Sequence, residues 1–299
     1  MRPETHTPTP AEVAPDQVGS LLGNALRDIG IPPCPEILTQ IHAEMAKDEP
    51  DLKYLDRIIC SDVALAAGLI AIANSPFFGF LKRVRSVREA LLMLGLRTTS
   101  QAIAGLILRK LFPDSPSLNR FWHSSASIAR LSAWLAQSSL REIRVQSDDA
   151  YTFGLFRDCG IPILLRRLPQ YPDVLKQANG EQEKRFTAVE DAHCPTNHAA
   201  VGCLLAQGWW LPDEICLAIR HHHDAFPADP VAAKPIPAPS RGLIATVQLA
   251  EHLFQHHTGL SQSQEWHKQG AACLQLLGLE EQAMAALYEQ SAEILHSED

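Results

Sequence analysis

The chain has 299 residues, of which 46% are hydrophobic and 20% charged, so it can bury one large core or two modest ones. Its formal net charge is −8, and its 26 Lys and Arg form no long run, which argues against a dedicated nucleic-acid binder and predicts no DNA partner. No continuous apolar run approaches the roughly 18 residues of a membrane span, so no membrane partner is expected either.

The cysteines and the N-terminus indicate the compartment. Seven cysteines are an odd number, they form no CxxC motif, and most lie within apolar helical patterns. Buried thiols in a reducing cytoplasm explain this usage best. Residues 1–17 are rich in Pro and Thr and have no apolar region typical of a signal peptide, so we predict a flexible arm and a cytoplasmic protein.

Helical periodicity dominates the first half of the chain. Apolar residues recur every three to four positions. Ser86 and Glu89 form a capping box at the start of one helix, and Gly95 ends that helix. Helices are expected over 16–30, 35–48, 51–62, 63–74, 86–95 and 98–112.

The stretch "PDSPSLN", residues 113–119, interrupts this pattern, and further helices follow it. They are expected over 121–139, 148–168, 172–178, 197–210, 212–223, 243–255 and 280–295. The five prolines of 224–240 predict a long loop, and we find no convincing β pattern. The sequence therefore predicts an all-α, two-lobed protein, with an arm at 1–17, an N-terminal lobe at 18–115 and a second lobe with C-terminal helices at 116–299.

The stretch "ANSPFFGF", residues 73–80, places aromatic side chains in a turn. Pro76 stops the preceding helix, and Gly79 can adopt a positive φ. Phe77 and Phe78 either fold back into the core and fix the corner, which we favour, or anchor a protein partner.

Three stretches together resemble the HDOD domain, a bacterial signalling module related to the HD phosphohydrolase superfamily. They are "IPPCPEILTQIHAEM", "LDRIICSDVALAAGLIAIANSPFFGF" and "VRSVREALLMLGLRTTSQAI", and the resemblance extends over about residues 18–255. It implies a regulatory role in two-component or cyclic-dinucleotide signalling, exerted through a protein partner.

The resemblance also implies where metal ligands would lie. His123 matches the first histidine of the superfamily pattern, Asp158 the aspartate of the His-Asp pair, and His198 the next ligand. The remaining matches are His222 and His223 at the distal pair and Glu251 at the late aspartate.

Arg157 stands where the paired histidine belongs, and Ile161 stands where a lysine is usual. A guanidinium only donates hydrogen bonds and cannot bind a cation, although it can pair with Asp158 or Glu251 in place of a metal. We therefore predict a degenerate site with no catalytic and no cofactor-binding residue.

Three functions remain open. The first, which we favour, is a non-catalytic signalling protein that requires no cofactor, although a residual divalent metal on His123, Asp158, His198 and one of His222 or His223 is an alternative. The second is a metal-dependent phosphohydrolase or phosphodiesterase acting on nucleotides or cyclic dinucleotides. The third is a sensor in which Arg157 and the histidines bind an anionic ligand such as a nucleotide or cyclic dinucleotide.

Overall fold

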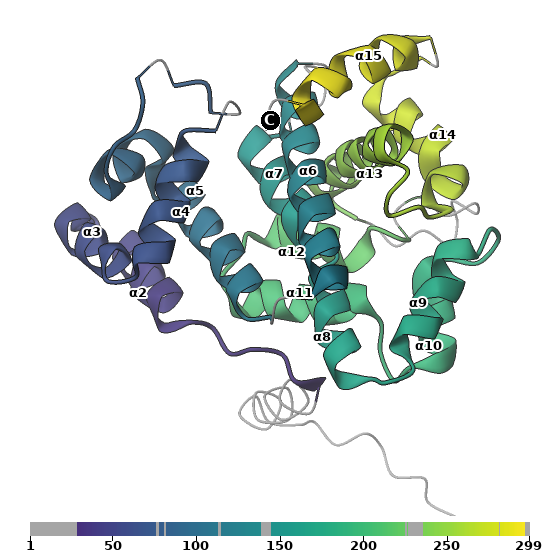
Figure 1. Ribbon diagram of the computed structural model, residues 1–299, viewed down its shortest axis with the longest axis horizontal. Helices are drawn as coiled ribbons and strands as arrows, with labels where there is room; N and C mark the ends of the chain where they lie inside the picture. Colours follow the sequence, from purple (N-terminus) through teal and green to yellow (C-terminus); the bar gives the residue numbers. More distant parts are fainter. Residues whose placement is uncertain are drawn as a thin grey trace, which may run out of the picture.

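A computed structural model describes residues 29–75, 78–80, 82–112, 115–138, 145–224, 226, 236–280 and 282–296. Within these residues the regular structure is helical and contains no strand, which confirms the predicted all-α class (Figure 1). The expected arm at 1–17 and most of the helix expected over 16–30 lie outside the described residues.

The N-terminal part of the chain forms helices at the places that periodicity predicts. They are α2 (Glu36–Met45), α3 (Leu52–Cys60), α4 (Val63–Ala73) and α5 (Val87–Lys110). Gly95 interrupts α5 with φ 75° and ψ 169°, a conformation that suits glycine, and so separates the two helices predicted there.

Side-chain caps fix where these helices begin. Asp51 accepts hydrogen bonds from the first turn of α3, and Asp62 does the same for α4. Ser86 accepts from the backbone N of Glu89, as the capping box predicts, while the Glu89 carboxylate reaches back to the backbone N of Arg85 (2.8 Å).

The second part of the chain supplies the remaining helices. They are α6 (Pro116–Ser138), α7 (Ser147–Phe156), α8 (Gly160–Arg167), α9 (Tyr171–Gly180), α10 (Phe186–His193), α11 (His198–Gly208), α12 (Asp213–His221), α13 (Ala238–Thr258), α14 (Glu265–Leu277) and α15 (Ala283–His296).

Several features of this part differ from the sequence prediction. Helix α6 begins at Pro116, inside the predicted break at 113–119, and α13 begins at Ala238, inside the predicted loop at 224–240. The helix expected over 148–168 is two helices, because Pro162 cannot continue a helix from residue 158 but fits the first turn of α8. Helices α10 and α14 were not expected at all, although both prove to carry residues of the site described below.

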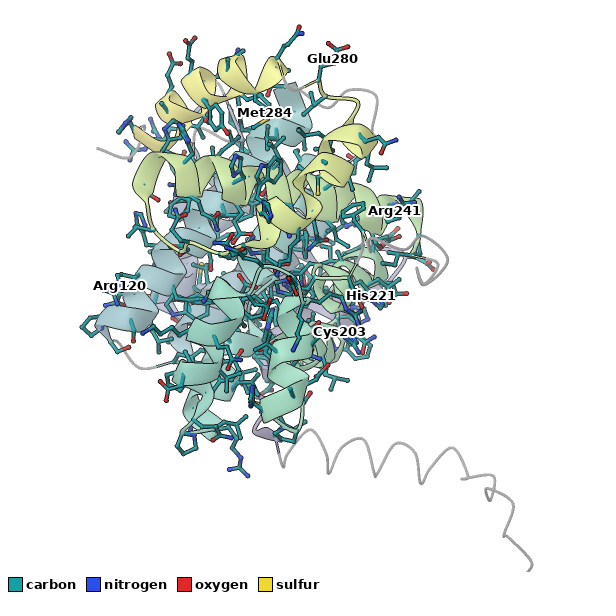
Figure 2. The ribbon with its side chains drawn as sticks, turned by 90° about the vertical axis from the view of Figure 1, so that its right-hand side faces the viewer. Arg120, Cys203, His221, Arg241, Glu280 and Met284 are labelled. Carbon is teal, nitrogen blue, oxygen red and sulfur yellow. The ribbon has the colours of Figure 1, made fainter. Side chains whose placement is uncertain are left out.

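The centre of the molecule is built from α6, α7 and α13, which pack against one another (Figure 1). Helix α15 covers one end of this group, where Met284 and Leu287 are buried (Figure 2). The hydrophobic core continues from α2 to α15, and Trp209 Nε1 donates to the carbonyl of Pro32 (3.3 Å) across it. The core thus joins the N-terminal helices to the rest.

Helix α5 is long and apolar enough to cross a membrane by length and composition, although the sequence analysis expected no such segment. Half of its most apolar 18-residue stretch is buried within the protein. The helix packs against α2, α3, α4 and α7. Arg97 on α5 also pairs with Asp149 on α7, where its Nη2 donates to both carboxylate oxygens (2.8 and 2.9 Å). These contacts are those of a core helix.

The corner between α4 and α5 is held by Asn74. Its Nδ2 donates to the carbonyl of Val84 (2.7 Å), and its Oδ1 accepts from the backbone N of Val84 (2.8 Å). The half-buried ring of Phe78 stacks on Phe80 with 5.8 Å between centroids, whereas Phe77 lies outside the described residues. The corner is therefore pinned by a polar contact as well as by aromatic packing.

Candidate metal centre

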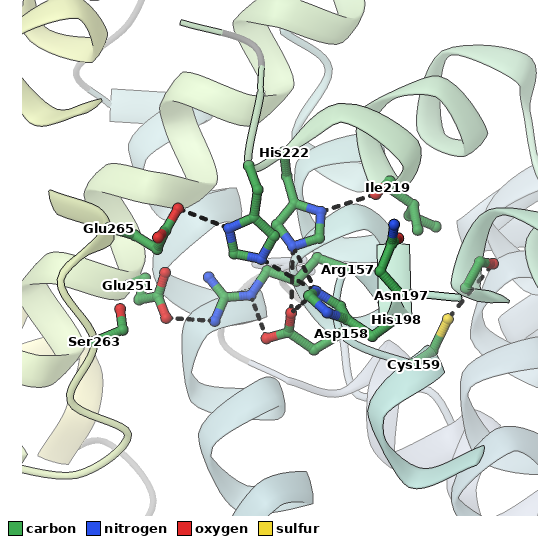
Figure 3. A network of polar contacts seen from close by, with 12 residues as sticks. Arg157, Asp158, Cys159, Asn197, His198, Ile219, His222, Glu251, Ser263 and Glu265 are labelled. Carbon is green, nitrogen blue, oxygen red and sulfur yellow. Dashed lines mark hydrogen bonds and ion pairs between the residues drawn. The ribbon is translucent and has the colours of Figure 1, made fainter. Parts of the chain in front are cut away.

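Four side chains from three separate segments of the second part of the chain converge on one point. They are Asp158, His198, His222 and His223, and one ligand atom from each lies within 4.8 Å of the others (Figure 3). Asp158 lies between α7 and α8, His198 is the first residue of α11, and the two other histidines follow α12. All three histidines are buried.

The end of α12 explains how two consecutive histidines reach one centre. Neighbouring residues inside a helix point about 100° apart, which made the sequence "HHHD" a weak indication of a site. The helix ends at His221, so His222 and His223 lie in the turn that follows it. His221 itself faces elsewhere and contacts Asp224 (3.0 Å).

Each of the three imidazoles has an acceptor at Nδ1. His198 Nδ1 lies 2.7 Å from a Glu190 carboxylate oxygen, and His223 Nδ1 lies 2.7 Å from Glu265. His222 Nδ1 lies 2.8 Å from the carbonyl of Ile219. Carboxylates and carbonyls accept hydrogen bonds, so the proton of each neutral ring is on Nδ1 and the lone pair is on Nε2.

The three Nε2 atoms face one another and Asp158. His198 Nε2 lies 3.2 Å from His222 Nε2 and 3.1 Å from His223 Nε2, while Asp158 Oδ1 lies 3.5 and 3.4 Å from the Nε2 atoms of His198 and His222. Ligands about 2.0–2.1 Å from a tetrahedral ion are roughly 3.4 Å apart. Four of the six distances between the ligand atoms are close to this spacing, and all six are within 4.8 Å, so the set fits a divalent metal ion.

Arg157 occupies the other side of Asp158. Its Nε donates to Asp158 Oδ2 (2.9 Å), and its Nη2 donates to Glu251 Oε1 (2.7 Å) (Figure 3). Burial alone would lower the pKa of the guanidinium, but the two carboxylates outweigh it and raise that pKa. Arg157 therefore remains charged and holds both carboxylates away from any second metal ion.

The formal charges around the cluster add a second argument for a cation. Four carboxylates lie in this region, those of Asp158, Glu190, Glu251 and Glu265, against the cations Arg157 and Lys268, which contacts Glu265. A divalent ion would cancel the remaining two negative charges, which are costly to bury without a partner.

The pKa shifts follow from the same contacts. Burial would raise the pKa of Asp158, but Arg157 and His222 hold it well below its usual range. Burial would lower the pKa of His198, but Glu190 raises it, so a proton competes with a metal for this ring. Burial and the neighbouring His222 lower the pKa of His223 to about 4.

The structure does not bring every candidate residue into this cluster. His123 is exposed on α6, with its ring centroid 6.5 Å from that of Phe254, and it is not among the converging ligands. Glu251 contacts Arg157 rather than the histidines. Both distal histidines, His222 and His223, take part, whereas the alternative residual site of the sequence analysis included only one of them.

Several supporting residues escaped the sequence analysis. Glu190 binds His198 and also accepts from the hydroxyl of Tyr171, and the ring of Phe186 stacks on His223 with centroids 4.6 Å apart. Glu265 orients His223 from α14. Only recognition of α10 and α14 as helices facing the cluster would have pointed to these residues.

A cavity of about 160 Å³ adjoins the cluster. Its lining includes Arg157, His222, His223, Glu251 and Glu265, together with four serines and several apolar side chains. Ligand pockets for drug-sized molecules usually measure roughly 300–1,000 Å³, so this cavity suits a small ion or a few water molecules better than a dinucleotide.

We expect Gly160→Ala to be among the most destabilising small substitutions in this region. A Cβ at Gly160 would lie 2.1 Å from the carbonyl oxygen of His198, so α8 and α11 would have to separate. The expected loss is about 3 kcal/mol, at the upper end for overpacking, and is measured by chemical denaturation. The matched control is Gly180→Ala, where a Cβ has no neighbour within 4 Å, and equal stability of the two variants would contradict the prediction.

Comparison with known families identifies the fold. The HDOD domain model matches residues 31–225, more than half of the chain, and the chain therefore belongs to the HDOD family. A Treponema pallidum (strain Nichols) protein of uncharacterized function is 27% identical over 224 residues. That match covers 74% of this chain and 41% of the relative, so the chain spans less than half of the relative's length.

Solved structures share the fold at low identity. An HDOD domain protein of unknown function from Geobacter sulfurreducens aligns with a TM-score of 0.62 at 22% identity, covering 93% of this chain and 97% of that one. A Shewanella amazonensis SB2B protein, whose name proposes a phosphohydrolase, aligns with a TM-score of 0.63 at 17% identity, covering 91% and 93%. A Marinobacter aquaeolei VT8 protein, whose name proposes signal transduction, gives 0.62 at 21%, covering 94% and 62%.

Proposed function

We propose that this HDOD protein is a non-catalytic regulator of bacterial signalling in the cytoplasm, which acts through contact with a protein partner. The observation that carries the proposal is the buried guanidinium of Arg157 between Asp158 and Glu251. In an HD-type hydrolase with two ions, these carboxylates would be available to metal. Here a permanent positive charge of the protein neutralises them.

The converging ligands support a structural ion rather than a catalytic one. Structural metal sites are closed by four protein ligands, whereas catalytic sites keep a position open for water or substrate. Three imidazoles and Asp158 supply four ligands here. An ion bound to these four ligands would cross-link three segments of the chain, namely α11, the end of α12 and the junction of α7 with α8.

The competing functions use the same cavity. A phosphohydrolase is favoured by the contact between the cavity and the histidines, and an anion sensor is favoured by Arg157 in the cavity wall. The small volume argues against nucleotides and cyclic dinucleotides for both. A sensor would instead bind an anion of the size of phosphate, with Arg157→Ala abolishing its binding in calorimetry.

The experiment that tests the proposal is a hydrolysis assay with a defined metal content. Protein loaded with Mn²⁺, Fe²⁺ or Zn²⁺ is incubated with bis(p-nitrophenyl) phosphate and with cyclic di-GMP. We expect product formation equal to that of the Asp158→Asn variant, because neither protein has a working site. Metal-dependent turnover by the wild type that disappears in Asp158→Asn would overturn the non-catalytic assignment.

A further inference from the structure

The loop before α5 and the first turn of α5 carry a basic surface that the metal centre does not explain. Lys82, Arg83, Arg85 and Arg88 are all exposed and lie within seven residues of a chain whose formal net charge is −8. Among the described residues, none of the four makes an ion pair with a carboxylate. Four of the 26 Lys and Arg are thus gathered at one place with no ion-pair partner in the part of the chain that the structure describes.

The backbone holds these cations in a fixed arrangement. Val84 and Val87 alternate with them and are only 3% and 2% exposed, so the chain is anchored at each apolar position. Asn74 binds both backbone groups of Val84, and Glu89 binds the backbone N of Arg85. The basic side chains therefore project from a scaffold that needs little ordering when a partner binds.

Helix stability does not account for the two arginines nearest to α5. Arg85 and Arg88 lie at its N-terminal end, where the helix dipole disfavours positive charge and favours acidic groups. Binding to another molecule therefore explains these two arginines better than a contribution to helix stability does.

Apolar side chains continue the same surface along α5. Leu92 is 63% exposed and follows Arg88 by four positions, which places these two side chains on one helix face. Met93, the next residue along the chain, points to a neighbouring face and is 46% exposed. Large exposed apolar side chains beside unpaired cations are typical of an interface in which apolar contacts provide affinity and charges provide specificity.

We propose that Lys82, Arg83, Arg85 and Arg88, with Leu92 and Met93, form the docking surface for an acidic segment of a partner protein that also carries apolar side chains. The inference rests on the proposed function, because it names the chemistry of the partner. A nucleic acid fits less well, since the chain as a whole is acidic and exposed Leu92 and Met93 have no counterpart on a phosphate backbone. An anionic membrane fits less well because Phe78 and Phe80 are half-buried and stacked on each other.

The test uses a short fluorescein-labelled peptide of repeated Glu-Glu-Leu-Leu, measured by fluorescence anisotropy with the full chain. We expect saturable binding that weakens with added salt and weakens roughly tenfold in the double variant Arg83→Glu with Arg85→Glu. Leu92→Ser should weaken binding without changing its salt dependence. The matched control is Arg166→Glu with Arg167→Glu, an exposed pair on α8, which should bind as the wild type does.

Two comparison probes complete the experiment, a random-sequence DNA duplex and vesicles of phosphatidylcholine with phosphatidylglycerol. The proposal is overturned if the peptide does not bind, if both double variants lose binding equally, or if only DNA or vesicles bind. Metal content and hydrolysis are measured on the same samples. Turnover would refute the non-catalytic function, whereas loss of peptide binding without turnover would refute only the docking surface.

Discussion

Purified protein freed of metal and then titrated with Zn²⁺ or Mn²⁺ is expected to bind one equivalent and to gain stability. The three Nε2 lone pairs and Asp158 Oδ1 already lie at the spacing of a ligand set, and the surrounding carboxylates favour a cation. At a free metal concentration a thousandfold above Kd, the gain in the free energy of unfolding is about 4 kcal/mol. Elemental analysis and thermal unfolding measure the two quantities.

His198→Ala and His123→Ala distinguish this site from the one that family resemblance first implied. His198 is buried in the cluster, so its loss should remove the bound metal and the stabilisation. His123 is exposed outside the cluster, so its loss should leave both unchanged. Metal retained in His198→Ala, or lost in His123→Ala, would contradict the assignment of ligands.

Arg157→Ala is expected to destabilise the metal-free protein by about 3–5 kcal/mol, because it leaves two buried carboxylates without their cation. Asp158 and Glu251 then carry uncompensated charge, and added divalent metal should restore part of the lost stability by taking the place of the guanidinium. Chemical denaturation with and without metal measures both effects.

Arg157→Lys provides the control for charge alone. Lysine keeps the positive charge, but it lacks the planar guanidinium whose separate nitrogens reach both carboxylates. The stability of the Arg157→Lys variant should therefore lie between that of the wild type and that of Arg157→Ala. An Arg157→Ala protein as stable as the wild type in metal-free buffer would show that the ion pair is not needed, and the argument for a built-in replacement of the second ion would fail.

Local signals in the sequence were sufficient to predict the boundaries of the helices in the N-terminal part of the described chain. Asp51, Asp62 and Ser86 cap the helices that follow them, and Gly95 marks the boundary inside α5, since capping and positive φ depend on adjacent residues only. Pro162 divided a predicted helix in two for an equally local reason that the prediction overlooked.

The metal centre was predicted less completely because it depends on contacts between distant segments. The sequence placed Asp158, His198, His222 and His223 in one candidate set together with His123, but periodicity gives no distance between helices. Only the packing of α11, α12 and the α7–α8 junction separates the four converging residues from the exposed His123. Glu190 and Glu265 were missed because α10 and α14 were missed.

The sequence by itself determined that the chain is helical, that it belongs with HDOD domains, and that residue 157 carries a fixed positive charge where a hydrolase would have a histidine. The helical class follows from periodicity, and the fixed charge follows from side-chain chemistry. The HDOD assignment and the histidine expected at position 157 follow from the resemblance of the sequence motifs. None of these needs knowledge of the fold. The tertiary structure decided which lone pairs face one another and which carboxylates Arg157 neutralises. Those properties depend on distances of a few ångströms between residues up to 94 positions apart, which only packing sets.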